Sequence, residues 1–184
     1  MTTISYSSNS LLSGADKVLL ESILEYYNDN IENIKKLLSI VKRKNGMSLR
    51  VIDYLCTNYS KEHSIVIETK DGHIPRDLNG DYQKNLNAYN KKYLDPFSRR
   101  NKIVINISYD NNETHEKRNT SIGQLNFFRW FFKNNIDQYL SREKKTIEAH
   151  MKKTENESRK NKKRKAVKMC TSRSYVGSFI MNFD

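Results

Sequence analysis

Cysteine, glycine and proline are all scarce in this chain of 184 residues, which contains two, six and two of them. The two cysteines, Cys56 and Cys170, are too few for a disulfide framework. The glycines form neither GxxxxGK[ST] nor GxGxxG, the loops that hold phosphates in many nucleotide-binding enzymes. The four histidines and two cysteines lack the paired spacing of zinc ligands. We therefore expect a non-enzymatic protein without a cofactor or a bound metal.

Long apolar runs are missing as well. No stretch approaches the roughly 18 consecutive apolar residues of a membrane-spanning helix, so we expect no membrane span. The opening MTTISYSSNSLLSG has neither the basic leader nor the apolar core of a signal peptide, which predicts an intracellular protein. Apolar residues make up 36% of the chain. Because soluble domains usually contain about 45 to 50% when glycine is counted, we expect a modest core.

Acidic residues are too few to balance the basic ones. The chain has 33 Lys and Arg residues against 21 Asp and Glu residues, and its net charge is +12. Residues 142–168 alone hold twelve of the cations and four of the acids, a net charge of +8. A cationic surface attracts polyanions because binding releases counterions. Nucleic acid is therefore the first partner to expect, ahead of an acidic protein or an anionic membrane.

Hydrophobic periodicity predicts three amphipathic helices in the first third of the chain. The first is expected from an N-cap at Asp16 to the polar break at 28–30, the second over 31–44, and the third over 49–59 with Ser48 as its N-cap. Short β-branched runs predict strands at Ile65–Glu68 and Lys102–Ser108. Residues 70–80 and 110–118 are expected to be loops.

Two further helices are predicted after the first strand. One carries Tyr82, Leu86, Tyr89 and Tyr93 at helical spacing and ends at the Asp95-Pro96 pair. The other spans 122–140 and is capped by Thr120 or Ser121. The sequence therefore predicts an α+β protein, a mainly helical single domain with a small two-stranded sheet and a basic C-terminal extension. We expect a disordered arm at 1–15, a globular domain at 16–140, a basic segment at 141–168 and an apolar tail at 169–184.

The stretch QLNFFRWFFKNNI, residues 124–136, contains four of the seven phenylalanines and the single tryptophan. Its spacing places Leu125, Phe128, Phe132 and Ile136 on one helical face, which predicts the central packing element of the domain. Phe127, Trp130 and Phe131 widen the apolar arc beyond one face. Either the helix is nearly surrounded by the domain, which we favour, or this edge meets a partner. If the helix is surrounded, the charged side chain of Arg129 must emerge at the rim of the domain or pair with an acidic residue.

Two segments are candidates for nucleic-acid binding. The run RKNKKRK has the composition of a localisation signal or a nucleic-acid-binding patch, and its candidate residues are Arg159, Lys160, Lys162, Lys163, Arg164 and Lys165. The segment 82–100 interleaves tyrosines with cations, a pattern suited to single strands because rings stack on bases. Its candidate residues are Lys91, Lys92, Arg99 and Arg100. The alternatives are a solvated charged tail in the first case and core-facing tyrosines in the second.

Other arrangements carry weaker signals. Residues 31–44 and 49–59 could form a helix-turn-helix, although the second helix would present a mixed face of Arg50, Asp53, Thr57 and Asn58. His63 and His73 flank the first strand near Asp71 and could converge on a metal. Cys56 lies on an apolar helical face, where we expect an inert buried thiol.

The end of the chain, SYVGSFIMNFD, is apolar again after the long charged segment. Such a segment must find a groove in its own core or on a partner. Its candidate partner-binding residues are Tyr175, Phe179 and Phe183. This supports a rival function, a structural or adaptor protein that docks through its aromatic helix and this tail.

Three segments carry a family resemblance: VIDYLCTNYSKEH (Val51–His63), YQKNLNAYNKKYLDPFSRR (Tyr82–Arg100) and TSIGQLNFFRWFF (Thr120–Phe132), followed by KKRK. In this order they resemble an uncharacterised family of small basic proteins of nucleo-cytoplasmic large DNA viruses of the mimivirus and chlorovirus kind. The resemblance covers roughly residues 48–168 and implies a viral origin without a defined activity. It agrees with the abundance of Lys and Asn, whose codons are rich in A and T.

We therefore expect a viral nucleic-acid-binding protein that acts in transcription or genome packaging through its basic C-terminal segment. Its expected place is the host cytoplasm within the viral factory, the virion or the nucleus. A viral protein partner is the second expected contact. With a viral origin, the rival function is that of a virion structural or adaptor protein. The sequence does not show whether the bound nucleic acid is DNA or RNA, and it does not define the oligomeric state.

Overall fold

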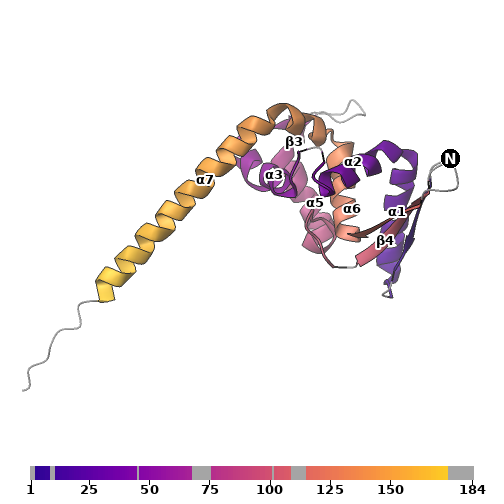
Figure 1. Ribbon diagram of the computed structural model, residues 1–184, viewed down its shortest axis with the longest axis horizontal. Coiled ribbons are helices and arrows are strands. Elements are labelled where there is room, and N and C mark those ends of the chain that lie inside the picture. The colour runs from indigo at the N-terminus through magenta and orange to yellow at the C-terminus, as the bar shows by residue number, and fades with distance from the viewer. Residues whose placement is uncertain are drawn as a thin grey trace, which may run out of the picture. The chain divides into compact units, whose positions relative to one another are not determined.

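The computed structural model describes residues 3–8, 11–44, 46–67, 76–100, 102–108 and 115–173. The chain divides into two compact units, the first up to Lys144 and the second from Lys145 onward. The first unit contains both sheets and most of the helices (Figure 1). It combines a mainly helical structure with a small antiparallel sheet, which confirms the predicted α+β class.

Helix α1, Gly14–Asp29, begins with a capping box. The hydroxyl of Ser13 accepts a hydrogen bond from the Asp16 backbone N–H at 3.2 Å, and the Asp16 carboxylate accepts one from the Ser13 backbone N–H at 3.4 Å. The predicted N-cap at Asp16 is therefore wrong by three positions, because Ser13 caps the helix and Asp16 is its reciprocal partner. The predicted polar break is correct, since the helix ends at Asp29.

Helix α2, Ile31–Val41, buries the apolar face that the sequence predicted. It ends before the predicted limit at Lys44. The third helix is one continuous path of three segments: α3, Leu49–Tyr54, a π-helical stretch, Leu55–Tyr59, and α4, Ser60–Glu62. Ser48 caps it as predicted, with its hydroxyl accepting a hydrogen bond from the Val51 N–H at 3.2 Å.

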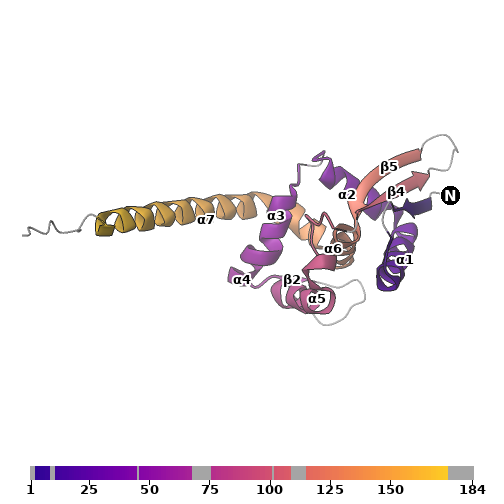
Figure 2. The same ribbon diagram turned by 90° about the horizontal axis from the view of Figure 1, so that it is seen from below.

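The main sheet is three-stranded and antiparallel, in the order β1-β4-β5 (Figure 2). Its strands are β1, Thr3–Ser7, β4, Lys102–Ser108, and β5, His115–Ser121. Ile103, Ile105 and Ile107 of β4 are buried, and the alternate residues of that strand are partly exposed. A separate two-stranded sheet pairs β2, Val66–Ile67, with β3, Arg76–Asp77.

Three predictions about these strands need correction. Residues 1–15 are not a disordered arm throughout, because β1 pairs with β4 and the Asn28 side chain accepts a hydrogen bond from the Ile4 N–H at 2.8 Å. The predicted loop at 110–118 includes the start of β5. The predicted two-stranded sheet is also wrong, since the strand after α4 pairs with β3 and not with β4. β5 is polar throughout and lacks the apolar alternation by which a strand is recognised, whereas β1 alternates but is short and lies in a Ser- and Thr-rich segment.

Helix α6, Ile122–Lys133, lies between α1 and α5, Leu78–Tyr93, in the middle of the first unit (Figure 1). Ser121 is its N-cap, one of the two predicted residues. Both edges of its aromatic arc are buried, because Phe127 and Phe131 are 0% exposed and Trp130 is 7% exposed. The predicted core role of this stretch is therefore confirmed, and the helix is nearly surrounded by its own domain.

Polar groups of α6 find partners despite this burial. The Trp130 indole N–H donates a hydrogen bond to the buried Asp81 carboxylate at 2.7 Å, and the Tyr27 hydroxyl donates one to the Leu125 carbonyl at 3.0 Å. Arg129 reaches the rim as predicted, where it donates to the hydroxyls of Ser22 and Tyr89.

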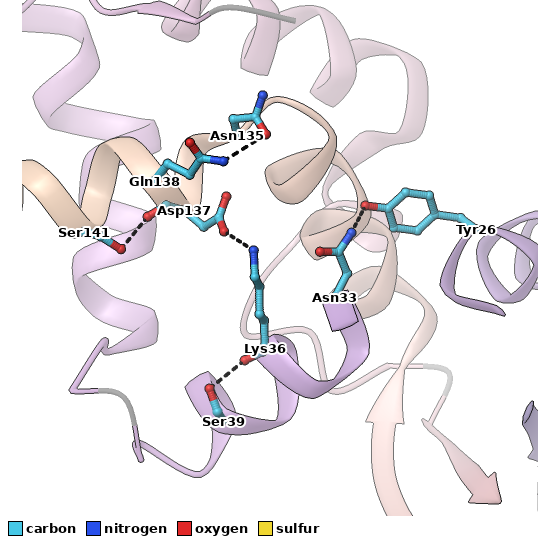
Figure 3. Close-up of polar contacts among 8 residues, drawn as sticks. All are labelled: Tyr26, Asn33, Lys36, Ser39, Asn135, Asp137, Gln138 and Ser141. Carbon is cyan, nitrogen blue, oxygen red and sulfur yellow. Dashed lines mark hydrogen bonds and ion pairs between the residues drawn. The ribbon is translucent and has the colours of Figure 1, made fainter. Parts of the chain in front are cut away.

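The predicted single helix over 122–140 is two helices. The chain turns at Asn134 and Asn135, and Asn135 adopts the left-handed conformation (φ 52°) that asparagine tolerates better than most residues. Helix α7, Ile136–Arg173, then begins. Its first turn is tied to α2 by an ion pair of 2.8 Å between the Lys36 ammonium and the Asp137 carboxylate (Figure 3). The second unit consists, in its described part, of the continuation of α7 to Arg173.

Replacing Phe127 by alanine is expected to lower the free energy of unfolding by about 3 to 5 kcal/mol, because a fully buried ring is removed from a packed core. Urea unfolding followed by circular dichroism measures this. Val18→Ala is the control, since Val18 is 68% exposed on α1 and should change the free energy by less than about 0.5 kcal/mol. Equal effects of the two substitutions would contradict the assignment of α6 as the core.

Candidate nucleic-acid interface

The helical backbone of α5 is interrupted at Asn90, just before Lys91 and Lys92. Asn90 has φ 51° and ψ 172°, outside the helical region, although helical residues precede and follow it. Its side-chain oxygen accepts a hydrogen bond from the Lys92 N–H at 2.8 Å, which stabilises the turn. Non-glycine residues held in such sparsely populated conformations cluster at functional sites. Here the break places Lys91 and Lys92 beside the loop that follows.

The loop after α5 is anchored to the start of α6 by hydrogen bonds from four different residues. The Asn126 side chain donates to the carbonyl of Tyr93, the last residue of α5, at 2.9 Å. The side chains of Gln124 and of the N-cap Ser121 donate to the loop carbonyls of Pro96 at 2.8 Å and Ser98 at 2.9 Å. In the other direction the Asp95 N–H donates to the Gly123 carbonyl at 3.3 Å. The loop is therefore held on the core helix and has a defined conformation.

Gly123 is required for this close packing. A Cβ added there would lie 2.7 Å from the Lys92 carbonyl oxygen and 2.8 Å from the Ser98 hydroxyl oxygen. Real Cβ atoms do not approach other heavy atoms so closely, so any side chain at position 123 would push the loop away from α6.

The loop and the end of α5 surround a pocket of about 410 Å³, which we call the cationic pocket. Its lining residues are Lys91, Lys92, Asp95, Phe97, Ser98, Arg99 and Arg100. Four cations therefore face one carboxylate. Among the residues that the structure describes, no acidic group forms a salt bridge with Lys91, Arg99 or Arg100. Such a surplus of positive charge attracts anions.

Lys92, unlike the other three cations of the pocket, is held by contacts with other residues that the structure describes. Its ammonium donates a hydrogen bond to the Tyr93 hydroxyl at 2.6 Å and lies 3.9 Å from the Asp16 carboxylate. The hydrogen bond to Tyr93 is the main reason that the pKa of Lys92 is raised. A hydrogen bond from Tyr93, with further help from Ser13 and Lys92, lowers the pKa of Asp16 against the opposing effect of burial. The network joins the capping box of α1 to the edge of the cationic pocket.

A second hollow of about 490 Å³ adjoins the first, because Ser98 and Arg99 line both. We call it the strand pocket. Its other lining residues come from β4, β5 and α6: Lys102, Ile103, Val104, Asn119, Thr120 and Gln124. Val104 and Asn119 are directly opposite each other in the β4–β5 register, so their side chains share one face of the sheet. This pocket combines two cations with amide, hydroxyl and apolar groups.

The structure brings together one of the two predicted nucleic-acid-binding groups. Lys91, Lys92, Arg99 and Arg100 are exposed and line the same pocket. The predicted aromatic partners behave differently: Tyr82 is buried against Phe127 and Trp130, and burial raises its pKa. Tyr89 and Tyr93 are partly buried and hydrogen-bonded to Arg129 and Lys92. The alternative, a core-facing tyrosine, is therefore correct for Tyr82.

The other predicted group lies on α7. Arg159, Lys160, Lys162, Lys163 and Arg164 are exposed, and Lys165 belongs to the same helix. The predicted partner-binding residues Tyr175, Phe179 and Phe183 lie outside the described residues, so docking through them stays a prediction. His73 and Asp71 of the possible metal site also lie outside them. His63 stacks on the Tyr59 ring at 4.1 Å between ring centroids.

Two further predictions concern the third helix. Cys56 is completely buried, which confirms the expected buried thiol. This burial, followed by the charge of Asp53, raises the pKa of the thiol. The proposed reading helix of a helix-turn-helix has Val51, Ile52 and Tyr54 in the core. Its exposed residues include Arg50 and Asn58, and Asp53 is half-buried with a pKa raised by burial and by Asp95.

Sequence reasoning missed three residues of the interface. Phe97 is 45% exposed and lines the cationic pocket, where it is the aromatic ring available to a ligand. A phenylalanine between proline and two arginines in a predicted loop was the available signal. No sequence signal indicated Lys102 and Asn119. These residues come close together only because β4 pairs with β5, a strand that the sequence did not predict.

Replacing Gly123 by alanine is expected to lower the free energy of unfolding by about 1 to 3 kcal/mol, because the added methyl group overlaps the Lys92 carbonyl. Urea denaturation measures the effect. Gly14→Ala is the matched control, since a Cβ at Gly14 meets nothing within 4 Å and should be neutral or slightly stabilising. A neutral Gly123→Ala would show that the loop is not packed as described.

Acidification is expected to reduce the stabilising effect of Asp16. Because its pKa is lower in the folded state than in the unfolded state, its contribution is complete above the unfolded pKa and is lost as the pH falls through the folded one. The wild type should therefore be more stable than Asp16→Asn near neutral pH, and the difference in unfolding free energy should shrink in the acid range. A difference that stays constant with pH would contradict the network with Tyr93.

Comparisons with known proteins place the chain in a family. None of the helices that the structure describes is long and apolar enough to cross a membrane. The uncharacterized protein L507 of Acanthamoeba polyphaga mimivirus is 31% identical to the chain over 164 residues, which cover 88% of this chain but only 62% of that relative. No solved structure matches the chain. The relative supports the resemblance to an uncharacterised family found in giant viruses. A model described as a family of unknown function, DUF7197, matches residues 3–178, and the chain belongs to this family.

Proposed function

We propose that this protein is a non-enzymatic nucleic-acid-binding protein of a large DNA virus, acting in transcription or genome packaging. The basic part of α7 supplies most of the affinity. The observation that carries the proposal is the exposure of Arg159, Lys160, Lys162, Lys163 and Arg164 on one helix. No acidic residue follows Glu157 within that helix, so nothing in its last turns offsets their charge.

The geometry of a basic helix explains the kind of binding that it would provide. Side chains on an α-helix repeat every 3.6 residues, so this dense run of cations surrounds the helix instead of forming one stripe. An α-helix fits the major groove of duplex DNA, where cations on its sides can meet phosphates of both strands. Phosphate contacts carry no direct sequence information. The proposal therefore includes affinity without a strong base preference.

The place of action follows from the same proposal. A protein that binds nucleic acid for transcription or packaging would be found in the viral factory, the nucleus or the virion. The rival function, a virion adaptor, would need docking through the aromatic helix and the apolar tail at 169–184. The aromatic rings of α6 are buried inside the domain and are therefore not exposed to a partner. An adaptor would have to dock mainly through the tail.

Replacing Lys160, Lys162, Lys163 and Arg164 by glutamine, which we call the basic-helix variant, is expected to weaken duplex binding. The slope of log affinity against log salt should become shallower by about three to four, because each phosphate contact on duplex DNA contributes about 0.9. Fluorescence anisotropy of the full chain with a labelled duplex across a salt series measures this slope. Glutamine keeps the helix because its helical propensity is close to that of lysine and arginine.

The matched control removes four positive charges from positions outside the basic part of α7. Lys17, Lys44, Lys61 and Lys84 are exposed, and their replacement by glutamine lowers the net charge equally. This control should change the slope much less than the basic-helix variant. Equal changes would mean that net charge and not α7 drives binding. If the unaltered chain does not bind nucleic acid at low salt, the proposed function is wrong and the adaptor becomes the better account.

A further inference from the structure

We propose that the cationic pocket and the strand pocket together bind a single strand of nucleic acid. In this arrangement Phe97 stacks on one base, Arg99 contacts the phosphate between two nucleotides, and the neighbouring base enters the strand pocket. The inference rests on the proposed function in that the ligand is nucleic acid. It adds a second site, on the globular unit, with a preference for unpaired strands that the basic helix does not provide.

The shape of the site supports a ligand that crosses from one hollow to the other. The pockets have volumes of about 410 and 490 Å³ and share Ser98 and Arg99, so these two residues form the boundary between them. Arg99 is exposed, and among the described residues it has no acidic partner. A guanidinium at such a boundary is well placed for a phosphate, because its planar donors match phosphate oxygens in pairs.

The charges of the site match a nucleic-acid backbone. Lys91 and Arg100 on one side and Lys102 on the other are exposed and likewise form no salt bridge with a described residue. Lys92 is partly neutralised by Asp16, which lies 3.9 Å from it. The cations that form no salt bridge therefore extend along both pockets, as a chain of several phosphates requires and a single phosphate ion does not.

Phe97 gives the site its preference for unpaired bases. It is 45% exposed although large apolar side chains of this unit are mostly buried. The loop that carries it is fixed by its hydrogen bonds to α6, and the Phe97 N–H donates to the Asp95 carboxylate at 2.8 Å. A ring presented on a fixed loop loses little entropy on binding. Bases stack on such rings only when they are unpaired and accessible.

The strand pocket offers groups that suit the edge of a base. Among the described residues, the amide of Asn119 has no hydrogen-bonding partner, and it is exposed. The Thr120 hydroxyl donates to the Gln124 side chain at 3.0 Å, which leaves its oxygen able to accept. Val104 adds an apolar surface beside Asn119. Amide and hydroxyl groups next to an apolar surface can recognise an unstacked base through its exposed edge.

The test compares single-stranded and duplex binding in the basic-helix variant, where affinity from α7 no longer hides the second site. Phe97→Ala and, separately, Arg99→Gln with Arg100→Gln are introduced into this full-length background. Anisotropy is measured with labelled oligo(dT), oligo(U) and a DNA duplex of equal length. We expect Phe97→Ala to lower single-strand affinity by about tenfold and duplex affinity by less than twofold, because stacking applies to unpaired bases.

Two controls make the result specific. Lys17→Gln with Lys84→Gln removes two exposed charges outside the site and should leave the single-strand preference unchanged. Inorganic polyphosphate, used as a competitor, should displace oligo(dT) less well than unlabelled oligo(dT) at equal charge. If polyphosphate displaces labelled oligo(dT) as well as unlabelled oligo(dT) does, both with Phe97 present and in Phe97→Ala, the site binds anions in general. That result would overturn the inference.

The outcomes also separate this inference from the proposed function. If the basic-helix variant keeps its duplex affinity while Phe97→Ala lowers single-strand binding, the second site is supported and the role of α7 is wrong. If Phe97→Ala and the arginine pair leave single-strand binding unchanged, or change duplex binding equally, the second site is wrong whatever α7 does. Equal melting temperatures of the variants, expected because these side chains are exposed, show that folding is unaffected.

Discussion

The nearly complete burial of helix α6 is the constraint on which the rest of the structure depends. Phe127, Phe128 and Phe131 are completely buried, and α1 and α5 both pack against this helix. In a domain with so few apolar residues, one aromatic helix provides a large share of the buried apolar surface that offsets the entropy of folding. The Trp130–Asp81 hydrogen bond shows how the polar atoms of this helix are satisfied at the same time.

The same constraint connects the core to the candidate interface. The first turn of α6 holds the loop after α5 through Gly123, Gln124 and Asn126, and that loop carries Phe97, Arg99 and Arg100. Two of the segments that carry the family resemblance, Tyr82–Arg100 and Thr120–Phe132, therefore meet in space, although nineteen residues separate them in sequence. A rigid support of this kind is what a binding loop needs, because side chains held in place lose less entropy when a ligand binds.

The sequence was informative where the signal was local or strongly periodic. It predicted the cap at Ser48, limited the cap of α6 to Thr120 or Ser121, and predicted the break after Asp29, the buried arc of α6 and the buried Cys56. It failed for β1, which is short and lies in a Ser- and Thr-rich segment, and for β5, which is polar throughout. Both strands form by pairing with the distant strand β4. The turn at Asn134 and Asn135 was missed because apolar spacing continues through it. The four cations of the cationic pocket were predicted, but Phe97 and Asn119 were not, since their roles depend on tertiary neighbours.

Cross-linking the full chain to nucleic acid by ultraviolet light, followed by mass spectrometry of the linked peptides, tests the central claim most directly. The claim is that this protein binds nucleic acid through exposed cations of α7 and through the pockets around Arg99. The account predicts cross-linked peptides from residues 91–104 with single strands and from residues 159–165 with both single strands and duplexes. The absence of cross-links, or cross-links confined to other surfaces, would contradict it.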